Sequence, residues 1–181
     1  MKIWRLLPRA DQMALVGGTV TAVLFTWTAL AVTQDVASRW RLLLDLPGLA
    51  AAYAYSFLAA TFETLLVTGF LIVISTILPR KILRDDFGVR GSLVAASLLV
   101  PLIGLTLQPP DWGTTRAYAE WLTWSLGLSV SSVLLGVLVP GFRRLTSALV
   151  ERLSVLIYVY APVALVSIAY VVARNVLRGV P

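Results

Sequence analysis

The sequence contains no cysteine and no histidine among its 181 residues. Disulfides, thiol nucleophiles, iron–sulfur clusters and most zinc sites need these residues, and histidine is the commonest general base. The chain also lacks a G-x-S-x-G motif and a carboxylate cluster that could hold magnesium. We therefore predict that the protein is not an enzyme and that it binds no metal and no cofactor.

Charged residues are scarce as well. They make up 13% of the chain, whereas about 25% is usual in soluble proteins, and 59% of the residues are hydrophobic. Most hydrophobic residues lie in blocks of about 20, the length that an α-helix needs to cross a bilayer. This pattern predicts an all-α integral membrane protein, a compact bundle of about five transmembrane helices with short loops, in one polytopic domain over residues 1–181. The helices are expected at 13–33, 50–78, 91–107, 121–139 and 148–173.

The net charge of +6 arises from basic residues clustered at the ends of these blocks. Such clusters are typical of topology determinants and not of a nucleic-acid-binding surface. With the N-terminus cytoplasmic and the C-terminus outside the cell membrane, ten of the fifteen Lys and Arg residues lie inside, as the positive-inside rule favours. The first block has the basic start of a signal peptide, but its apolar stretch is longer than usual, so we expect an uncleaved helix.

Two basic clusters follow predicted helices on the inner side. They either anchor the topology or contact the anionic headgroups of inner-leaflet lipids. The residues are Arg80, Lys81, Arg84, Arg143 and Arg144.

A short amphipathic stretch at residues 36–46 follows the first predicted helix. Its apolar side carries Trp40, Leu43 and Leu44. Stretches of this kind lie in the plane of the membrane interface. We predict a short helix in the outer interface, with these three side chains facing lipid.

Glu63 is the only charged residue between Asp45 and Arg80. On a helical wheel it lies beside Ser56, next to a row of small residues four apart, and such rows let membrane helices approach closely. We therefore expect Glu63 to lie on a packing face and not among acyl chains. Ser129 and Ser132, near the middle of the fourth predicted helix, are the candidate hydrogen-bonding partners. The small-residue row is Ala52, Ser56, Ala60, Thr64 and Thr68.

Three hypotheses for Glu63 stay open. It is a neutral acid that joins helices by hydrogen bonds, a group that meets a cationic or polar residue of a partner subunit, or a proton- or cation-coupling site. Ionisable residues inside a membrane are functional candidates by default. No Lys or Arg lies at the same depth in any predicted helix.

The first predicted helix carries two patterns of small and polar residues. Thr19, Thr26 and Thr33 recur every seven residues, which places them on one stripe that could line a polar path. Gly17, Gly18 and Thr21 form a small-residue face, which is our candidate for a surface that faces a partner subunit after the bundle has packed.

Two functions follow from these patterns. The short loops, the small-residue faces and the lack of catalytic groups favour a non-catalytic accessory or structural subunit of a larger membrane-protein assembly. Its partners would be lipid and either other subunits or further copies of itself. The alternative is a component for transport of a small solute, ion or proton, using Glu63 and a path lined by Ser and Thr.

Overall fold

A computed structural model of the protein describes residues 7–40, 43–80, 83–107 and 115–177. Over these ranges the chain is helical and contains no strand. The elements are α1 (Ala10–Asp35), a π-helical turn (Val36–Trp40), α3 (Leu46–Ile77), a 3-10 turn (Arg84–Asp86), α4 (Phe87–Leu107), α5 (Thr115–Leu138), α6 (Pro140–Val155) and α7 (Ile157–Leu177). Three stretches are long and apolar enough to cross a membrane: Ala10–Ser38, Leu46–Ile77 and Pro140–Leu177.

The second helix starts four residues earlier than the sequence predicted. Asp45 caps α3, because its carboxylate accepts a hydrogen bond of 2.9 Å from the backbone N–H of Gly48. Pro47 stands in the first turn, where its missing N–H costs no hydrogen bond. The 32 residues of α3 measure about 48 Å at 1.5 Å per residue, longer than the hydrocarbon core of a bilayer.

The predicted interfacial helix at 36–46 is seen in part. Val36–Trp40 continues α1 as a π-helical turn, Leu43 is again helical, residues 41–42 lie outside the described ranges, and α3 begins at Leu46. Leu43 and Leu44 are exposed, as expected, and Trp40 is half-buried. The described residues of this stretch are thus helical up to Leu43, and at least the first five continue directly from α1.

The fifth predicted helix, 148–173, is divided into two helices. Pro140 begins α6, and a tight turn at Leu156 separates α6 from α7. α6 is amphipathic: Thr146 and Val150, one turn apart, are buried, whereas Arg143 and Arg144 are exposed. α7 is mainly apolar, whereas α6 carries several charged residues, so a prediction based on apolar blocks missed the start of α6.

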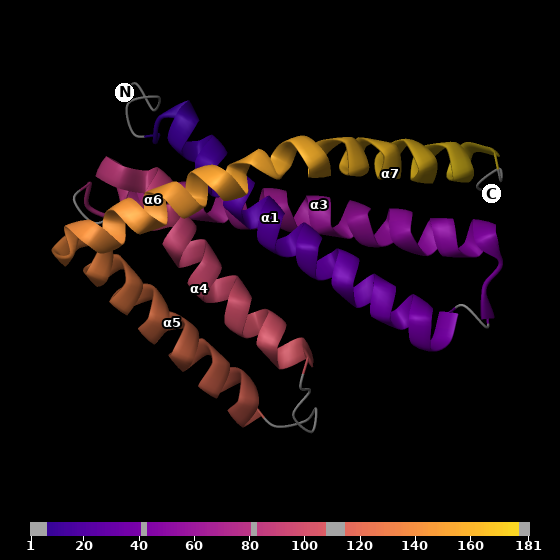
Figure 1. The fold of residues 1–181 in the computed structure, drawn as a ribbon, viewed down its shortest axis with the longest axis horizontal. Helices are drawn as coiled ribbons and strands as arrows, with labels where there is room; N and C mark the ends of the chain where they lie inside the picture. The colour runs from indigo at the N-terminus through magenta and orange to yellow at the C-terminus, as the bar shows by residue number, and fades with distance from the viewer. Residues whose placement is uncertain (1–6, 41–42, 81–82, 108–114, 178–181) are drawn as a thin grey trace.

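The helices form two arms that meet at one end, around α6 (Figure 1). α1 packs against α3, α4, α6 and α7, whereas α5 packs mainly on α4 and α6. From the shared end, α4 and α5 diverge from α1, α3 and α7, so the molecule is less compact than the predicted bundle. The start of α1 and the end of α7 lie at opposite ends of the long axis.

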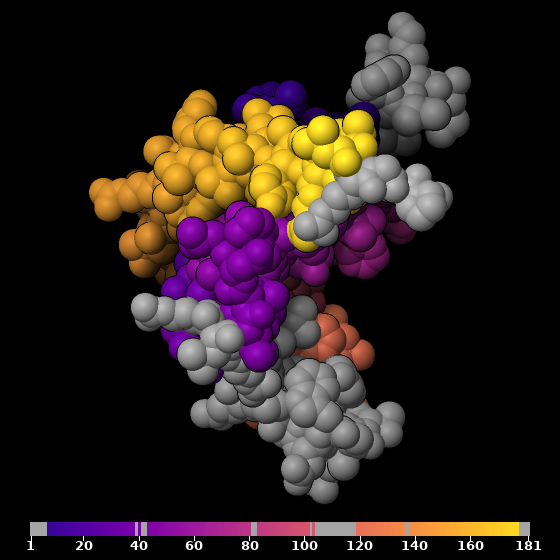
Figure 2. All heavy atoms as spheres, turned by 90° about the vertical axis from the view of Figure 1, so that its right-hand side faces the viewer, coloured from indigo at the N-terminus to yellow at the C-terminus, as the bar shows by residue number. Residues whose placement is uncertain are grey.

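α7 packs against α3 at the end of the molecule far from α6. Figure 2 looks at this end and shows the yellow end of α7 lying against the purple start of α3. The Tyr170 hydroxyl donates a hydrogen bond of 3.2 Å to the Pro47 carbonyl, and the Tyr55 hydroxyl donates one of 3.1 Å to the Asn175 side chain. Polar contacts therefore join the first turns of α3 to the last turns of α7.

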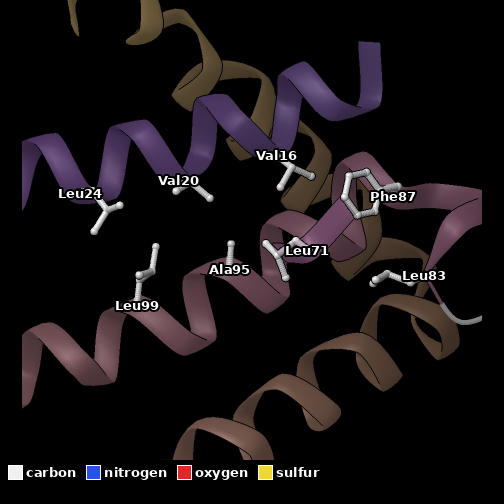
Figure 3. Packing of buried hydrophobic residues seen from close by; sticks show 8 residues of the cluster. All are labelled: Val16, Val20, Leu24, Leu71, Leu83, Phe87, Ala95 and Leu99. Carbon is white, nitrogen blue, oxygen red and sulfur yellow. The ribbon is translucent and has the colours of Figure 1, made fainter. Parts of the chain in front are cut away.

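The core lies where α1 crosses α3 and α4. Val16, Val20 and Leu24 recur every four residues on α1 and point at Ala95 and Leu99 of α4, as Figure 3 shows. Leu71 of α3, Leu83 and Phe87 complete the cluster at the end nearest Val16. Small and branched side chains at these positions let the helices approach closely, which favours packing where the hydrophobic effect between helices is weak.

The small-residue face of α1 is internal, so the prediction that it faces a partner subunit is wrong. A Cβ atom on Gly18 would lie 2.9 Å from the Cα atom of Ser154, because α6 crosses α1 at this point. Gly17 faces Thr68 of α3, and Thr21 is buried. The residues do serve close helix approach, but their partners belong to the same chain.

Candidate functional site

Glu63 lies on the outer surface of α3, near its middle. Its neighbours on that surface are large, exposed apolar side chains: Phe62, Leu66 and Phe70. The prediction that Glu63 lies on a packing face is therefore wrong. The buried face of α3 includes Ala60, and three residues of helix place Glu63 about 60° away from Ala60, at the edge of that face. Ser56, beside Glu63 on the wheel, is half-buried.

Glu63 makes no hydrogen bond and no ion pair with any residue that the structure describes. The two hydroxyls nearest in sequence bond within their own helix: Thr61 donates to the carbonyl of Phe57, and Thr64 to the carbonyl of Ala60, each at 2.8 Å. The described part of the chain thus leaves the carboxyl group of Glu63 facing outward among apolar side chains.

The predicted serine partners of Glu63, Ser129 and Ser132, form hydrogen bonds with other residues instead. Ser129 of α5 is 7% exposed, and its hydroxyl lies 2.7 Å from the hydroxyl of Ser97 in α4. Ser132 donates to the backbone carbonyl of Ser129 at 3.0 Å. Neither serine is hydrogen-bonded to Glu63, because α5 packs on α4 and α6 on the other side of the molecule.

The threonine stripe of α1 joins the first helix to three others. The Thr19 hydroxyl donates to Ser92 of α4 at 3.1 Å, and Thr26 is 2.7 Å from the hydroxyl of Tyr160 in α7. Thr33 is 3.4 Å from the hydroxyl of Tyr53 in α3. The sevenfold spacing predicted a single stripe, but nothing in it indicated three different partner helices.

A second site lies at the end where the two arms meet. A cleft of about 500 Å³ opens between the start of α4, the end of α5 and α6. At its edge, Arg143 Nε lies 2.8 Å from Asp86 Oδ2, and the Ser147 hydroxyl donates to Glu151 at 3.3 Å. The lining residues are Arg90, Gly136, Pro140, Arg143, Arg144, Ser147, Ala148 and Glu151.

This basic cleft contains two of the five predicted lipid-contact residues, Arg143 and Arg144. Arg80 is exposed and Arg84 half-buried, and neither lines the cleft, while Lys81 falls outside the described residues. Sequence reasoning missed Arg90, which comes from the start of α4. Its position at the inner end of a predicted helix was the available signal, but the approach of α6 to α4 was not visible in the sequence.

Among the described residues, no group of three or more acidic, cysteine or histidine side chains could hold a metal ion. Comparison of the chain with protein-family models, with curated proteins and with solved structures finds no match. What the fold and the two sites define is a helical protein with membrane-length apolar segments, an outward-facing carboxyl group and a basic cleft.

Proposed function

We propose that this chain is a non-catalytic accessory or structural subunit of a larger membrane-protein assembly. The observation that carries the proposal is the exposed position of Glu63 in the middle of α3, without a partner among the described residues. The chain would cross the cell membrane several times, with α3 as one of its spans.

The energetic argument concerns what surrounds Glu63 in a membrane. A charged side chain at the centre of a bilayer costs about 2.5–3.5 kcal/mol on insertion scales, and a polar group without a partner is unfavourable there. The exposed apolar residues beside it, Leu65 and Leu66 among them, are compatible with lipid. The carboxyl group is not compatible with lipid. Its position therefore favours contact with a neighbouring helix that supplies a cationic or hydroxyl side chain at the same depth.

The arrangement of the helices supports the proposed orientation. The start of α1 and the end of α7 lie at opposite ends of the molecule, as an odd number of crossings requires. The basic cleft and the amphipathic α6 lie at the end near the start of α1. Basic residues favour the cytoplasmic side, which supports a cytoplasmic N-terminus and an outer C-terminus.

Transport remains the alternative, with less support from the observed contacts. The hydroxyls that a polar path would use lie in helix–helix contacts, such as Thr19 with Ser92 and Ser97 with Ser129. These hydrogen bonds stabilise the association of helices within one chain, and Glu63 lies apart from them.

The test is gentle purification of the tagged wild-type chain from its native membranes, followed by mass spectrometry of what accompanies it. A photo-crosslinking residue is placed at Leu66, one turn from Glu63 and 72% exposed, and the control is placed at Val130 of α5, 59% exposed. We expect a different protein to co-purify and to be crosslinked from position 66 but not from 130, and Glu63→Leu to reduce its recovery.

Recovery of the chain alone, or crosslinked only to further copies of itself, would contradict the subunit proposal. Transport would then be tested by reconstituting the wild type and Glu63→Gln into proteoliposomes and comparing their proton and cation fluxes.

A further inference from the structure

The basic cleft differs in chemistry from the other cavities between the helices. A cavity of about 410 Å³ between α3 and α7 and one of about 300 Å³ beside α1 are lined almost wholly by apolar side chains. The basic cleft instead gathers Arg90, Arg143 and Arg144 from two helices around about 500 Å³. Three guanidinium groups on one cavity indicate an anionic ligand, because arginine presents a planar fork of donors that fits carboxylate and phosphate oxygens.

The carboxylates near the cleft leave Arg144 as its most available cation. Asp86 pairs with Arg143 at 2.8 Å, and Glu151 is the one acidic residue of the lining. Arg144 is exposed and forms no ion pair within the described residues. α6 begins at Pro140 in the cleft without a capping side chain, so the partial positive charge of the helix N-terminus adds to that of the arginines.

The surface beside the cleft is apolar. Leu138 at the end of α5 and Leu145 and Leu149 of α6 are large exposed hydrophobic residues. α6 thus presents a basic side to the cleft and exposes leucines next to it, the pattern of a helix lying at a membrane interface. A phospholipid has the matching chemistry, with a charged phosphate at the head and acyl chains below it.

We propose that the basic cleft binds an anionic phosphate group. Arg144 contributes most to this binding and Arg90 assists it, whereas the negative charge of Glu151 weakens it. The phosphate belongs to the headgroup of an anionic phospholipid or to a free phosphate, and the experiment separates these sources. The site is remote from Glu63 and does not depend on a partner subunit.

The experiment uses the full chain purified in an uncharged detergent. Native mass spectrometry measures the binding of phosphatidylglycerol and, for comparison, of zwitterionic phosphatidylcholine. The shift in melting temperature caused by inorganic phosphate at constant ionic strength measures the soluble source. Preference for phosphatidylglycerol identifies a lipid headgroup, whereas stabilisation by inorganic phosphate identifies a free phosphate. Absence of both would overturn the proposal.

Two variants test the assignment of the site. Arg144→Gln should weaken binding of the preferred probe about tenfold, the loss expected for one charge-assisted hydrogen bond. Arg152→Gln removes the same charge from an exposed position of α6 outside the cleft, so it should change affinity less than about twofold. Equal losses from both variants would mean that only the general positive charge of the surface attracts the probe.

Glu151→Gln provides a test with the opposite sign. Removing the one carboxylate of the lining should tighten phosphate binding about threefold, which a damaged or misfolded chain would not do. Asp85→Asn, at an exposed position outside the cleft, is the matched control and should leave affinity unchanged. Unchanged or weaker binding by Glu151→Gln would contradict the assignment of the phosphate to this cleft.

Discussion

α1 and α3 are both apolar enough to cross a membrane, yet the chain surrounds one and leaves the other largely uncovered. Half of the most apolar 18-residue stretch of the first helix is buried inside the protein, whereas only 11% of the corresponding stretch of α3 is buried. α1 packs between α3, α4, α6 and α7, whereas α3 presents most of its surface outward. Hydrophobicity alone therefore does not tell which helix is central.

The polar residues of the two helices also differ in their contacts. The hydroxyls of Thr19, Thr26 and Thr33 in α1 each meet a side chain of another helix, while Glu63 of α3 meets none among the described residues. α1 thus uses its polar groups to hold the fold together. α3 leaves its acidic group exposed, and the following experiments test this contrast between the two helices.

The largest effect is expected where α1 and α6 are closest. A Cβ on Gly18 would lie 2.9 Å from the backbone of Ser154, so Gly18→Ala should lower the free energy of unfolding by about 1–3 kcal/mol through overpacking. At Gly17 the nearest atom would be 3.8 Å away, in Thr68, and Gly17→Ala should be neutral or stabilising by up to about 1 kcal/mol. Reversible unfolding in mixed detergent micelles measures both, and equal effects would refute the central role of this crossing.

The next effect concerns the hydrogen bond between α1 and α4. A double-mutant cycle with Thr19→Val and Ser92→Ala should give a coupling of about 0.6 kcal/mol, and at most about 1.7, as for other hydrogen bonds between membrane helices. Thr123→Val is the control, because that hydroxyl bonds only the carbonyl of Ala119 in its own helix. A coupling near zero would mean that the threonine stripe does not join these helices.

A smaller coupling is expected between α1 and α7. The Thr26 and Tyr160 hydroxyls lie 2.7 Å apart in a more exposed position, so Thr26→Val with Tyr160→Phe should give about 0.5 kcal/mol or less. Tyr160→Phe keeps the aromatic ring, whose centroid lies 5.2 Å from that of the Phe25 ring, so the cycle reports on the hydroxyl alone. A value above that of the Thr19–Ser92 pair would reverse the proposed ranking.

The smallest effect is expected for Glu63 in the isolated chain. Because this residue touches no polar partner among those described, Glu63→Gln should change the free energy of unfolding of the purified monomer by less than about 0.5 kcal/mol. A large loss of stability in the same unfolding assay would show that Glu63 acts within the chain, and would remove the contrast between α1 and α3.

The sequence predicted the helices well because their signals are local. Apolar blocks, Pro79 after α3 and Pro140 after α5 place the last residue of each predicted helix within four residues of an observed helix end, whereas the starts of the fourth and fifth differ by six residues or more. The predictions were wrong where the answer depends on a neighbouring helix. Gly18 was predicted to face a partner subunit, and the sequence did not indicate that α6 of the same chain packs there.

By itself, the sequence determined an all-helical chain without cysteine or histidine, one carboxylate in the middle of a long apolar helix, and basic residues at the ends of its apolar blocks. Only the tertiary structure decided which face of each helix is covered, and therefore that Glu63 points outward and that Arg90 joins Arg143 and Arg144 in one cleft. The physical reason is that hydrophobicity and helix propensity act within a few residues. The side that a helix buries depends on packing against distant segments, such as Ser92 and Tyr160, which lie 73 and 134 residues from their partners in α1.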